Sequence, residues 1–96
     1  MAIEVRNQPD QRRYEVVVDG EVGGYSQYIR QGDRVIFVHT EIDPAFEGQG
    51  LGGILARGAL DDVRASGRRV IARCPFIAGW LERHPEYADL VVQDAS

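Results

Sequence analysis

The chain has 96 residues, a length that suits one compact domain. Its composition, 44% hydrophobic and 27% charged, is that of an ordinary globular protein and excludes disordered and membrane-spanning chains. A net charge of −4 argues against nucleic-acid binding, which usually needs a basic face. The single cysteine, Cys74, excludes an internal disulfide and fits a reducing compartment. We therefore expect a single cytoplasmic domain over residues 1–96 that contacts neither nucleic acid nor a membrane.

The first half of the chain is predicted to form strands joined by tight turns. Alternating or β-branched residues predict strands at 3–5, 14–18, 22–29 and 35–42. Asp19-Gly20 favours a type I′ hairpin turn, in which both central residues have positive φ. The window 35–42 is apolar in its first half. We expect it to be buried on both faces and central in an antiparallel meander.

The second half changes to a helical period. Apolar residues recur at helical spacing at Leu51, Ile54, Leu55, Ala59 and Val63. They predict a helix through Ala65 that Gly67 ends. A short strand at 70–74 follows, then a second helix from Pro75 and a last short strand at 90–92. Core positions of the second helix are Phe76, Ile77, Trp80 and Leu81. A strand, a helix and a strand over 35–74 form a βαβ unit with parallel strands, which gives an α/β (α+β) fold class.

Glycines are concentrated where the first helix begins, at positions 48, 50, 52 and 53. Inside a helix each would cost about 0.5–1 kcal/mol relative to alanine. At a helix start they let unpaired backbone N–H groups approach an anion such as a phosphate. The alternative is a loop that needs glycine only to turn and pack. The dinucleotide-binding motif and the P-loop both fail, because the glycines do not follow the first strand and no Gly-Lys-Ser/Thr is present.

The run Glu47-Gly48-Gln49-Gly50-Leu51-Gly52 resembles the pyrophosphate-binding motif Gln/Arg-x-x-Gly-x-Gly/Ala of GNAT-type N-acetyltransferases. Further motifs make the chain similar to the short, single-domain Yjdj-type branch of that family. They are His39-Thr40-Glu41-Ile42, Cys74-Pro75-Phe76 and His84-Pro85-Glu86-Tyr87. Glu47 departs from the motif, since a carboxylate beside a pyrophosphate is unfavourable. We therefore expect the backbone amides of residues 48–53, rather than a side chain, to bind the phosphates.

The resemblance implies a single GNAT-like N-acetyltransferase domain that transfers the acetyl group of acetyl-CoA, the cosubstrate, to an amine. The acceptor is unknown, and a protein lysine or terminus is one option. The implied acetyl-CoA-binding residues are Ile42, Gly48, Gln49, Gly50, Leu51, Gly52 and Gly53. The family usually places two helices between the first two strands, for which this chain has no room. We expect an open acceptor side, used by a bulky acceptor or closed by a second subunit, so a monomer and a homodimer both remain open. The alternative function is a non-catalytic CoA-binding module.

Three residues are candidates for catalysis, and no metal site is expected. In the family a glutamate on the central strand often accepts the amine's proton, which points to Glu41; the alternative is a charge facing solvent. His39 lies two residues earlier and so on the same face, as an alternative base or a structural residue. Cys74 follows a parallel strand and precedes a helix, a position that favours a reactive thiol, although buried cysteines are commonly inert.

Overall fold

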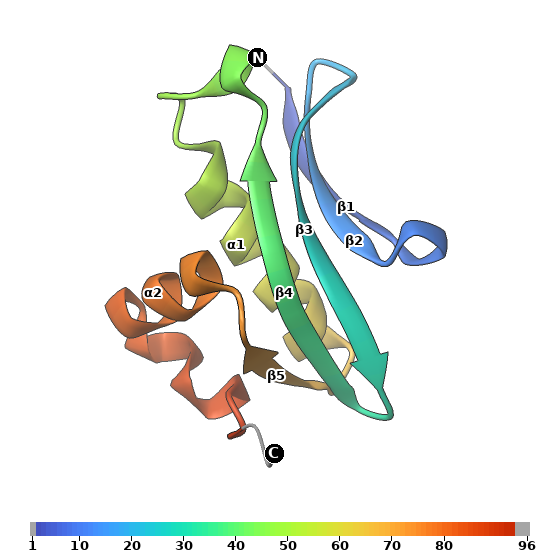
Figure 1. Cartoon of the computed structure of the whole chain (residues 1–96), viewed down its shortest axis with the longest axis vertical. Helices are drawn as coiled ribbons and strands as arrows, with labels where there is room; N and C mark the ends of the chain where they lie inside the picture. Colours follow the sequence, from blue (N-terminus) through green and yellow to red (C-terminus); the bar gives the residue numbers. More distant parts are fainter. Residues whose placement is uncertain (1, 94–96) are drawn as a thin grey trace.

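The computed structural model describes residues 2–93 (Figure 1), so both ends of the domain expected over 1–96 lie outside the described residues. Five strands form one sheet in the order β1-β2-β3-β4-β5. They are β1 (Ile3–Gln8), β2 (Arg13–Val18), β3 (Glu21–Gln31), β4 (Arg34–Ile42) and β5 (Arg69–Ala72). The first four strands are antiparallel neighbours and β5 is parallel to β4. The predicted meander, βαβ unit and fold class are confirmed.

Two α-helices and three short 3-10 helices join or follow the strands. They are η1 (Pro9–Gln11), η2 (Pro44–Phe46), α1 (Leu51–Ala65), α2 (Pro75–Arg83) and η3 (Pro85–Leu90). Figure 1 shows α1 behind the sheet and α2 beside β5. Gly67 follows α1 with φ of 72°, as expected of a residue that ends a helix. No helix within residues 2–93 is long and apolar enough to cross a membrane.

The connections between β1, β2 and β3 are as short as the sequence predicts. Asp19 and Gly20 have φ values of 49° and 86°, in agreement with the type I′ turn between β2 and β3. Only η1 joins β1 to β2, which confirms that the two helices usual in the family are missing at this point. One face of the sheet is therefore left without a helix from this connection.

The core lies between the sheet and the two α-helices, with Phe37 of β4 and Leu55 of α1 fully buried. The prediction that Ile54 and Phe76 lie in the core is wrong, because Ile54 is 40% and Phe76 is 37% exposed. Leu60, which falls off the predicted stripe, has no exposed surface. The cause is that α1 packs against both the sheet and α2, so its buried arc is wider than one stripe and is turned away from Ile54.

The C-terminal strands are shorter than predicted. β5 ends at Ala72 instead of reaching residue 74, because the Phe37 carbonyl accepts from the N–H groups of both Arg73 (3.0 Å) and Cys74 (2.8 Å), which breaks the regular ladder. The strand predicted at 90–92 is reduced to a single parallel bridge between Val70 and Val91.

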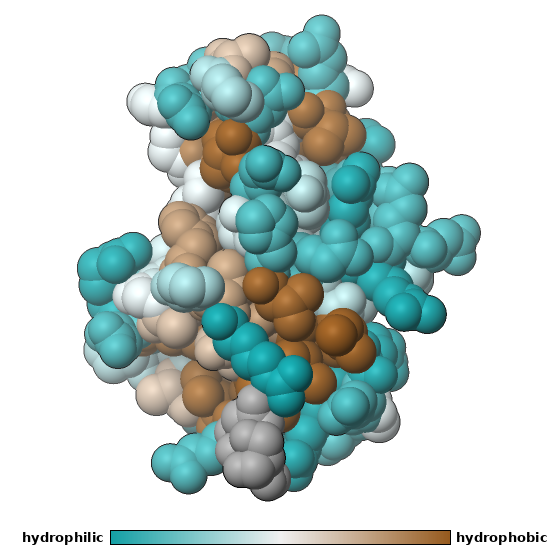
Figure 2. All heavy atoms as spheres, in the orientation of Figure 1, coloured by the Kyte–Doolittle hydropathy of each residue, from teal (hydrophilic) through white to brown (hydrophobic). Residues whose placement is uncertain are grey.

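The sheet face opposite α1 is only partly polar. Ile29, Ile36 and Ile71 are direct neighbours across β3, β4 and β5, and none of them belongs to the main core cluster. Figure 2 shows hydrophobic atoms over the lower part of this face and mostly hydrophilic atoms over the upper part of β3 and β4. β4 runs toward this polar upper part, and the chain then turns back into α1.

Candidate functional site

The candidate site begins with a β-bulge in β4. Gln27 of β3 pairs with His39, and the next residue, Tyr28, pairs with Phe37, so Val38 is an extra residue in β4. The pairing of β4 with β5 ends at Phe37 and Ala72. Residues 39–42 keep their β3 partners, and residues 38–42 have no strand partner on the other side within the described chain (Figure 1). The two parallel strands thus diverge and leave a free backbone edge on β4.

Side chains span this divergence on the face that carries the helices. The Cys74 thiol donates to Thr40 Oγ1 at 3.3 Å, and Thr40 Oγ1 lies 2.9 Å from Ser26 Oγ. Cys74 is 2% exposed and Ser26 has no exposed surface. Because Thr40 accepts from the thiol, its own hydroxyl proton can go to Ser26. The result is a connected row of small polar groups between β4 and the start of α2.

The start of α1 is open to an anion. Gly50 precedes the helix with φ of 73° and Gly48 has φ of 83°, values that other residues rarely adopt. A Cβ atom added at either position would meet nothing within 4 Å. No described side chain caps the helix, so the first-turn amides remain available. Backbone N–H groups and the helix dipole therefore favour negative charge here.

The other two loop glycines lie in the first turn of α1, and of these two, packing requires glycine only at Gly52. A Cβ added at Gly52 would lie 2.7 Å from Cζ of Phe76, which covers this part of the helix. One added at Gly53 would lie 3.7 Å from Trp80 Nε1. Gly52 thus fits the packing interpretation, whereas Gly48 and Gly50 form an open turn that is compatible with the anion-binding interpretation.

Glu41 and His39 lie on the sheet face opposite Cys74, where both side chains are well exposed. Tyr25 of β3 lies opposite Glu41 and donates its hydroxyl to Glu41 Oε2 at 2.8 Å. The same oxygen is 3.9 Å from His39 Nε2. The hydrogen bond to Glu41 raises the pKa of Tyr25, so the phenol stays protonated at neutral pH. Glu41 is therefore held in place by a neutral donor.

A small cavity of about 330 Å³ adjoins Glu41 and Tyr25. Asp43 and Arg13 also line it. The Arg13 guanidinium lies 4.8 Å from the centroid of the Tyr25 ring and is paired at 2.6 Å with the buried Glu15. This cavity is open to solvent and combines the carboxylates of Glu41 and Asp43 with the Tyr25 ring, over which the Arg13 cation lies.

The structure separates the candidate catalytic residues into two groups. Glu41 and His39 share one face of β4, as the alternation of the strand predicts, whereas Cys74 contacts Thr40 on the other face. Sequence reasoning did not identify Tyr25 or Thr40 as site residues. Thr40 stands inside a quoted motif, but the contact of Tyr25 with Glu41 depends on strand register, which the sequence does not reveal.

Two polar residues near α1 have structural partners instead of facing the site. Arg57 donates to the Tyr87 hydroxyl at 3.1 Å, and that hydroxyl donates to Asp61 at 2.6 Å. These contacts fasten η3 to α1. Burial, followed by the hydrogen bond to Asp61, raises the pKa of Tyr87.

Comparison with known proteins identifies the class to which this arrangement belongs. Residues 13–90 match the family model described as GCN5-related N-acetyl-transferase, so the chain belongs to the GNAT family of N-acetyltransferases. No curated protein sequence matches the chain significantly.

Three solved structures share the fold. A GCN5-like protein from Staphylococcus aureus has 19% identity and a TM-score of 0.71. The alignment covers 95% of this chain and 89% of that protein. The ribosomal-protein-S18-alanine N-acetyltransferase from Escherichia coli has 19% identity and a TM-score of 0.56, with 62% of this chain and 41% of that protein covered. A GNAT-family protein from Desulfovibrio desulfuricans has 23% identity and a TM-score of 0.53, with 79% and 52% covered.

Proposed function

We propose that the chain is an acetyl-CoA-dependent N-acetyltransferase that transfers an acetyl group to an amine. The observation that carries this proposal is an uncapped helix N-terminus that follows a free strand edge after a connection containing η2. Residues 38–42 of β4 have a backbone edge without a strand partner in the described chain, and α1 begins at Leu51. The helix N-terminus suits an anionic pyrophosphate, and the free strand edge suits the amide groups of a pantetheine arm.

The residues around this position fit acetyl-CoA. Gly48 and Gly50 leave the backbone uncovered, so a phosphate can approach the amides of residues 48–53 closely. Ile42 ends the free edge of β4 and is the residue at which a pantetheine arm would reach the loop. Glu47 stands where the family motif has Gln or Arg, and its charge would not help to bind a phosphate. We therefore assign the binding to the amides.

Bound acetyl-CoA supplies the acetyl group as a thioester, and transfer forms the N–C bond of an amide while the C–S bond breaks. Glu41 accepts the proton that the amine loses, directly or through water. Tyr25 holds the Glu41 carboxylate for this task, since its hydroxyl donates to it at 2.8 Å. His39, 3.9 Å from the same carboxylate, is the alternative base.

Cys74 and Thr40 lie on the opposite side of β4 from Glu41, where they can donate a proton to the leaving sulfur. We assign Cys74 this role, and not that of a nucleophile, because direct transfer to an amine needs no covalent intermediate; the hydrogen bond from the thiol to Thr40 would have to open for the proton to reach the sulfur. Glu41 would take a proton from the amine on one face of the strand, and Cys74 would give a proton to the leaving sulfur on the other.

The acceptor would enter from the face that carries Glu41. Only η1 joins β1 to β2, so no helix from this connection encloses that face. An open surface accommodates an amine carried on a large molecule, and we propose the amine of a polypeptide, a lysine side chain or a chain terminus. The cavity of about 330 Å³ beside Glu41 would receive the amine itself.

The test is release of free CoA thiol from acetyl-CoA in the presence of peptides with a lysine or a free terminus, with mass spectrometry of the products. We expect an acetylated peptide, and a loss of at least about a hundredfold in kcat for Glu41→Gln. Absence of acetyl-CoA binding in calorimetry would contradict the proposal.

A non-catalytic CoA-binding module is the second candidate. The exposure of the His39 and Glu41 side chains, 59% and 61%, favours it, because a general base is commonly more enclosed. Tight binding of acetyl-CoA without transfer to any peptide, and without an effect of Glu41→Gln, would identify this alternative.

A further inference from the structure

β1 is an edge strand with one side unpaired within the described chain. Among the described residues its only strand neighbour is β2. Just before β1, the carbonyl of Ala2 accepts from the Asp19 N–H at 2.8 Å and so points toward β2. Backbone groups of successive residues in an antiparallel strand point to opposite edges. Ile3, Val5 and Asn7 therefore direct their N–H and C=O groups outward, where they can pair with another strand.

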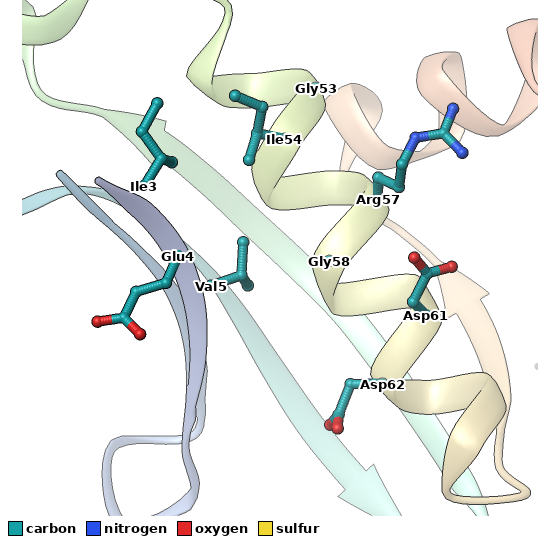
Figure 3. Close-up of a pocket in the computed structure, with 9 residues that line it drawn as sticks. All are labelled: Ile3, Glu4, Val5, Gly53, Ile54, Arg57, Gly58, Asp61 and Asp62. Carbon is teal, nitrogen blue, oxygen red and sulfur yellow. The ribbon is translucent and has the colours of Figure 1, made fainter. Parts of the chain in front are cut away.

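A groove lined by both apolar and charged residues runs beside this free edge. A cavity of about 670 Å³ lies between β1 and α1, and Figure 3 shows Ile3 and Val5 pointing into it while Glu4 points away. Ile54, 40% exposed, forms part of the opposite wall. A Cβ at Gly58 would lie 2.6 Å from Val5 Cγ2, so helix and strand approach closely at this point. A strand added to the edge would cover apolar side chains that are now half exposed.

The charges on β1 select one antiparallel register for a second copy of the same strand. Glu4 and Arg6 form an exposed ion pair on the face away from α1. In a register centred on Val5, Glu4 of each copy lies opposite Arg6 of the other. A shift of two residues either way would instead place Glu4 opposite Glu4 or Arg6 opposite Arg6, and like charges directly opposite are destabilising.

The same register also places the outward backbone N–H and C=O groups of the two strands opposite each other, on the strands that border the groove. Centring on Val5 puts Val5 opposite Val5 and Ile3 opposite Asn7, and all of these residues have outward N–H and C=O groups. A shift of one residue would place outward groups opposite inward ones and lose the hydrogen bonds. Charged residues on edge strands usually prevent pairing, but here they lie on the face away from the groove and complement each other.

We propose that β1 pairs with β1 of a second copy in the antiparallel register centred on Val5, which joins two sheets into one continuous sheet. β1 and the diverging β4 and β5 lie at opposite sides of the sheet order. The pairing therefore leaves the candidate site open, so this dimer would not close the acceptor side.

The test is a charge-exchange experiment in which analytical ultracentrifugation measures the dimer. Glu4→Arg gives two positive charges per strand and Arg6→Glu gives two negative ones, so each variant alone should dimerise at least about tenfold more weakly than the wild type. An equal mixture of the two should form a heterodimer, and the double variant Glu4→Arg/Arg6→Glu should dimerise like the wild type. CoA release should be unchanged in all of them.

Three results would overturn the proposal: a wild-type monomer at concentrations up to about 1 mM, single variants that dimerise normally, or a mixture that does not associate. A second measurement on the unaltered protein is amide hydrogen exchange. The Val5 N–H should be protected at high protein concentration and should lose this protection on dilution, because no strand among residues 2–93 of one copy pairs with it. Solvent-like exchange of Val5 at every concentration would also overturn the proposal.

Discussion

At the scale of single residues, the proposed reaction depends on how the Glu41 carboxylate is held. Tyr25 contributes one hydrogen bond to the Glu41 carboxylate at 2.8 Å, and its raised pKa keeps the donor proton in place through neutral and mildly alkaline pH. A base that is correctly oriented reacts faster, whereas the binding of acetyl-CoA does not depend on it. Tyr25 is thus a positioning residue in the proposed reaction.

Tyr25→Phe should lower kcat about tenfold without changing the KM for acetyl-CoA. Tyr28→Phe is the matched control. Tyr28 is also a tyrosine of β3, and its hydroxyl donates to Asn7 at 2.7 Å, away from the site. Steady-state kinetics on the two variants measures the difference. Equal effects of both changes would show that Tyr25 acts only through stability.

Cys74→Ser tests whether transfer is direct. Serine keeps a hydrogen bond to Thr40 but is a much weaker acid than the thiol, so direct transfer should continue with a kcat lowered about a hundredfold. A covalent acetyl-cysteine would instead require the thiol, and its removal would lower kcat by several orders of magnitude. Rapid-mixing kinetics and intact-protein mass spectrometry distinguish the two. Accumulation of acetylated wild-type protein would contradict direct transfer.

At the scale of secondary-structure elements, the loop before α1 carries the proposed anion site. Gly50→Val forces a β-branched residue to φ of 73° and places its side chain in the open space before the helix. It should weaken acetyl-CoA binding at least about tenfold and destabilise the fold by about 1–3 kcal/mol. Calorimetry measures the binding and urea unfolding the stability.

Gly32→Val is the matched control for that change. Gly32 also has positive φ, 60°, with nothing within 4 Å of an added Cβ, but it lies in the turn between β3 and β4. It should cost similar stability and leave acetyl-CoA binding intact. Glu47→Gln should leave the affinity unchanged or increase it. If Gly50→Val binds acetyl-CoA as well as Gly32→Val does, the anion site is misplaced.

The connection of η3 to α1 should make stability depend on acid pH. The hydrogen bond from Arg64, at 2.7 Å, lowers the pKa of Asp89 in the folded protein. A carboxyl with a lowered folded pKa stabilises the protein above its unfolded pKa of about 3.9, and this contribution is lost as the pH falls through the folded pKa. The difference in urea stability between wild type and Asp89→Asn should therefore shrink below about pH 4. A difference that stays constant from neutral pH to acid would contradict this.

At the scale of the whole molecule, local signals predicted most of the fold. Asp19-Gly20 set the hairpin, and Gly67 and Pro75 marked the end of α1 and the start of α2. These signals act within a few residues of the structure that they determine. The open turn at Gly48 and Gly50 also follows from a local signal, because glycine favours the positive φ found at both positions.

The features that were missed depend on contacts between distant segments. The bulge at Val38 is invisible in a continuous apolar run, and the pairing of Tyr25 with Glu41 follows from strand register. The burial of Leu60 and the exposure of Ile54 depend on where α2 packs against α1. Sequence therefore predicted the proposed anion site but did not assemble the groups around the candidate base.

The most direct test of the central claim is an amide NMR titration of the nitrogen-15-labelled protein with acetyl-CoA. We predict that the largest shifts fall on the amides of residues 48–53 and on those of residues 38–42, the free edge of β4. The amides of β1 should remain unshifted. Shifts absent from both segments, or concentrated on β1 and the groove beside it, would contradict the account.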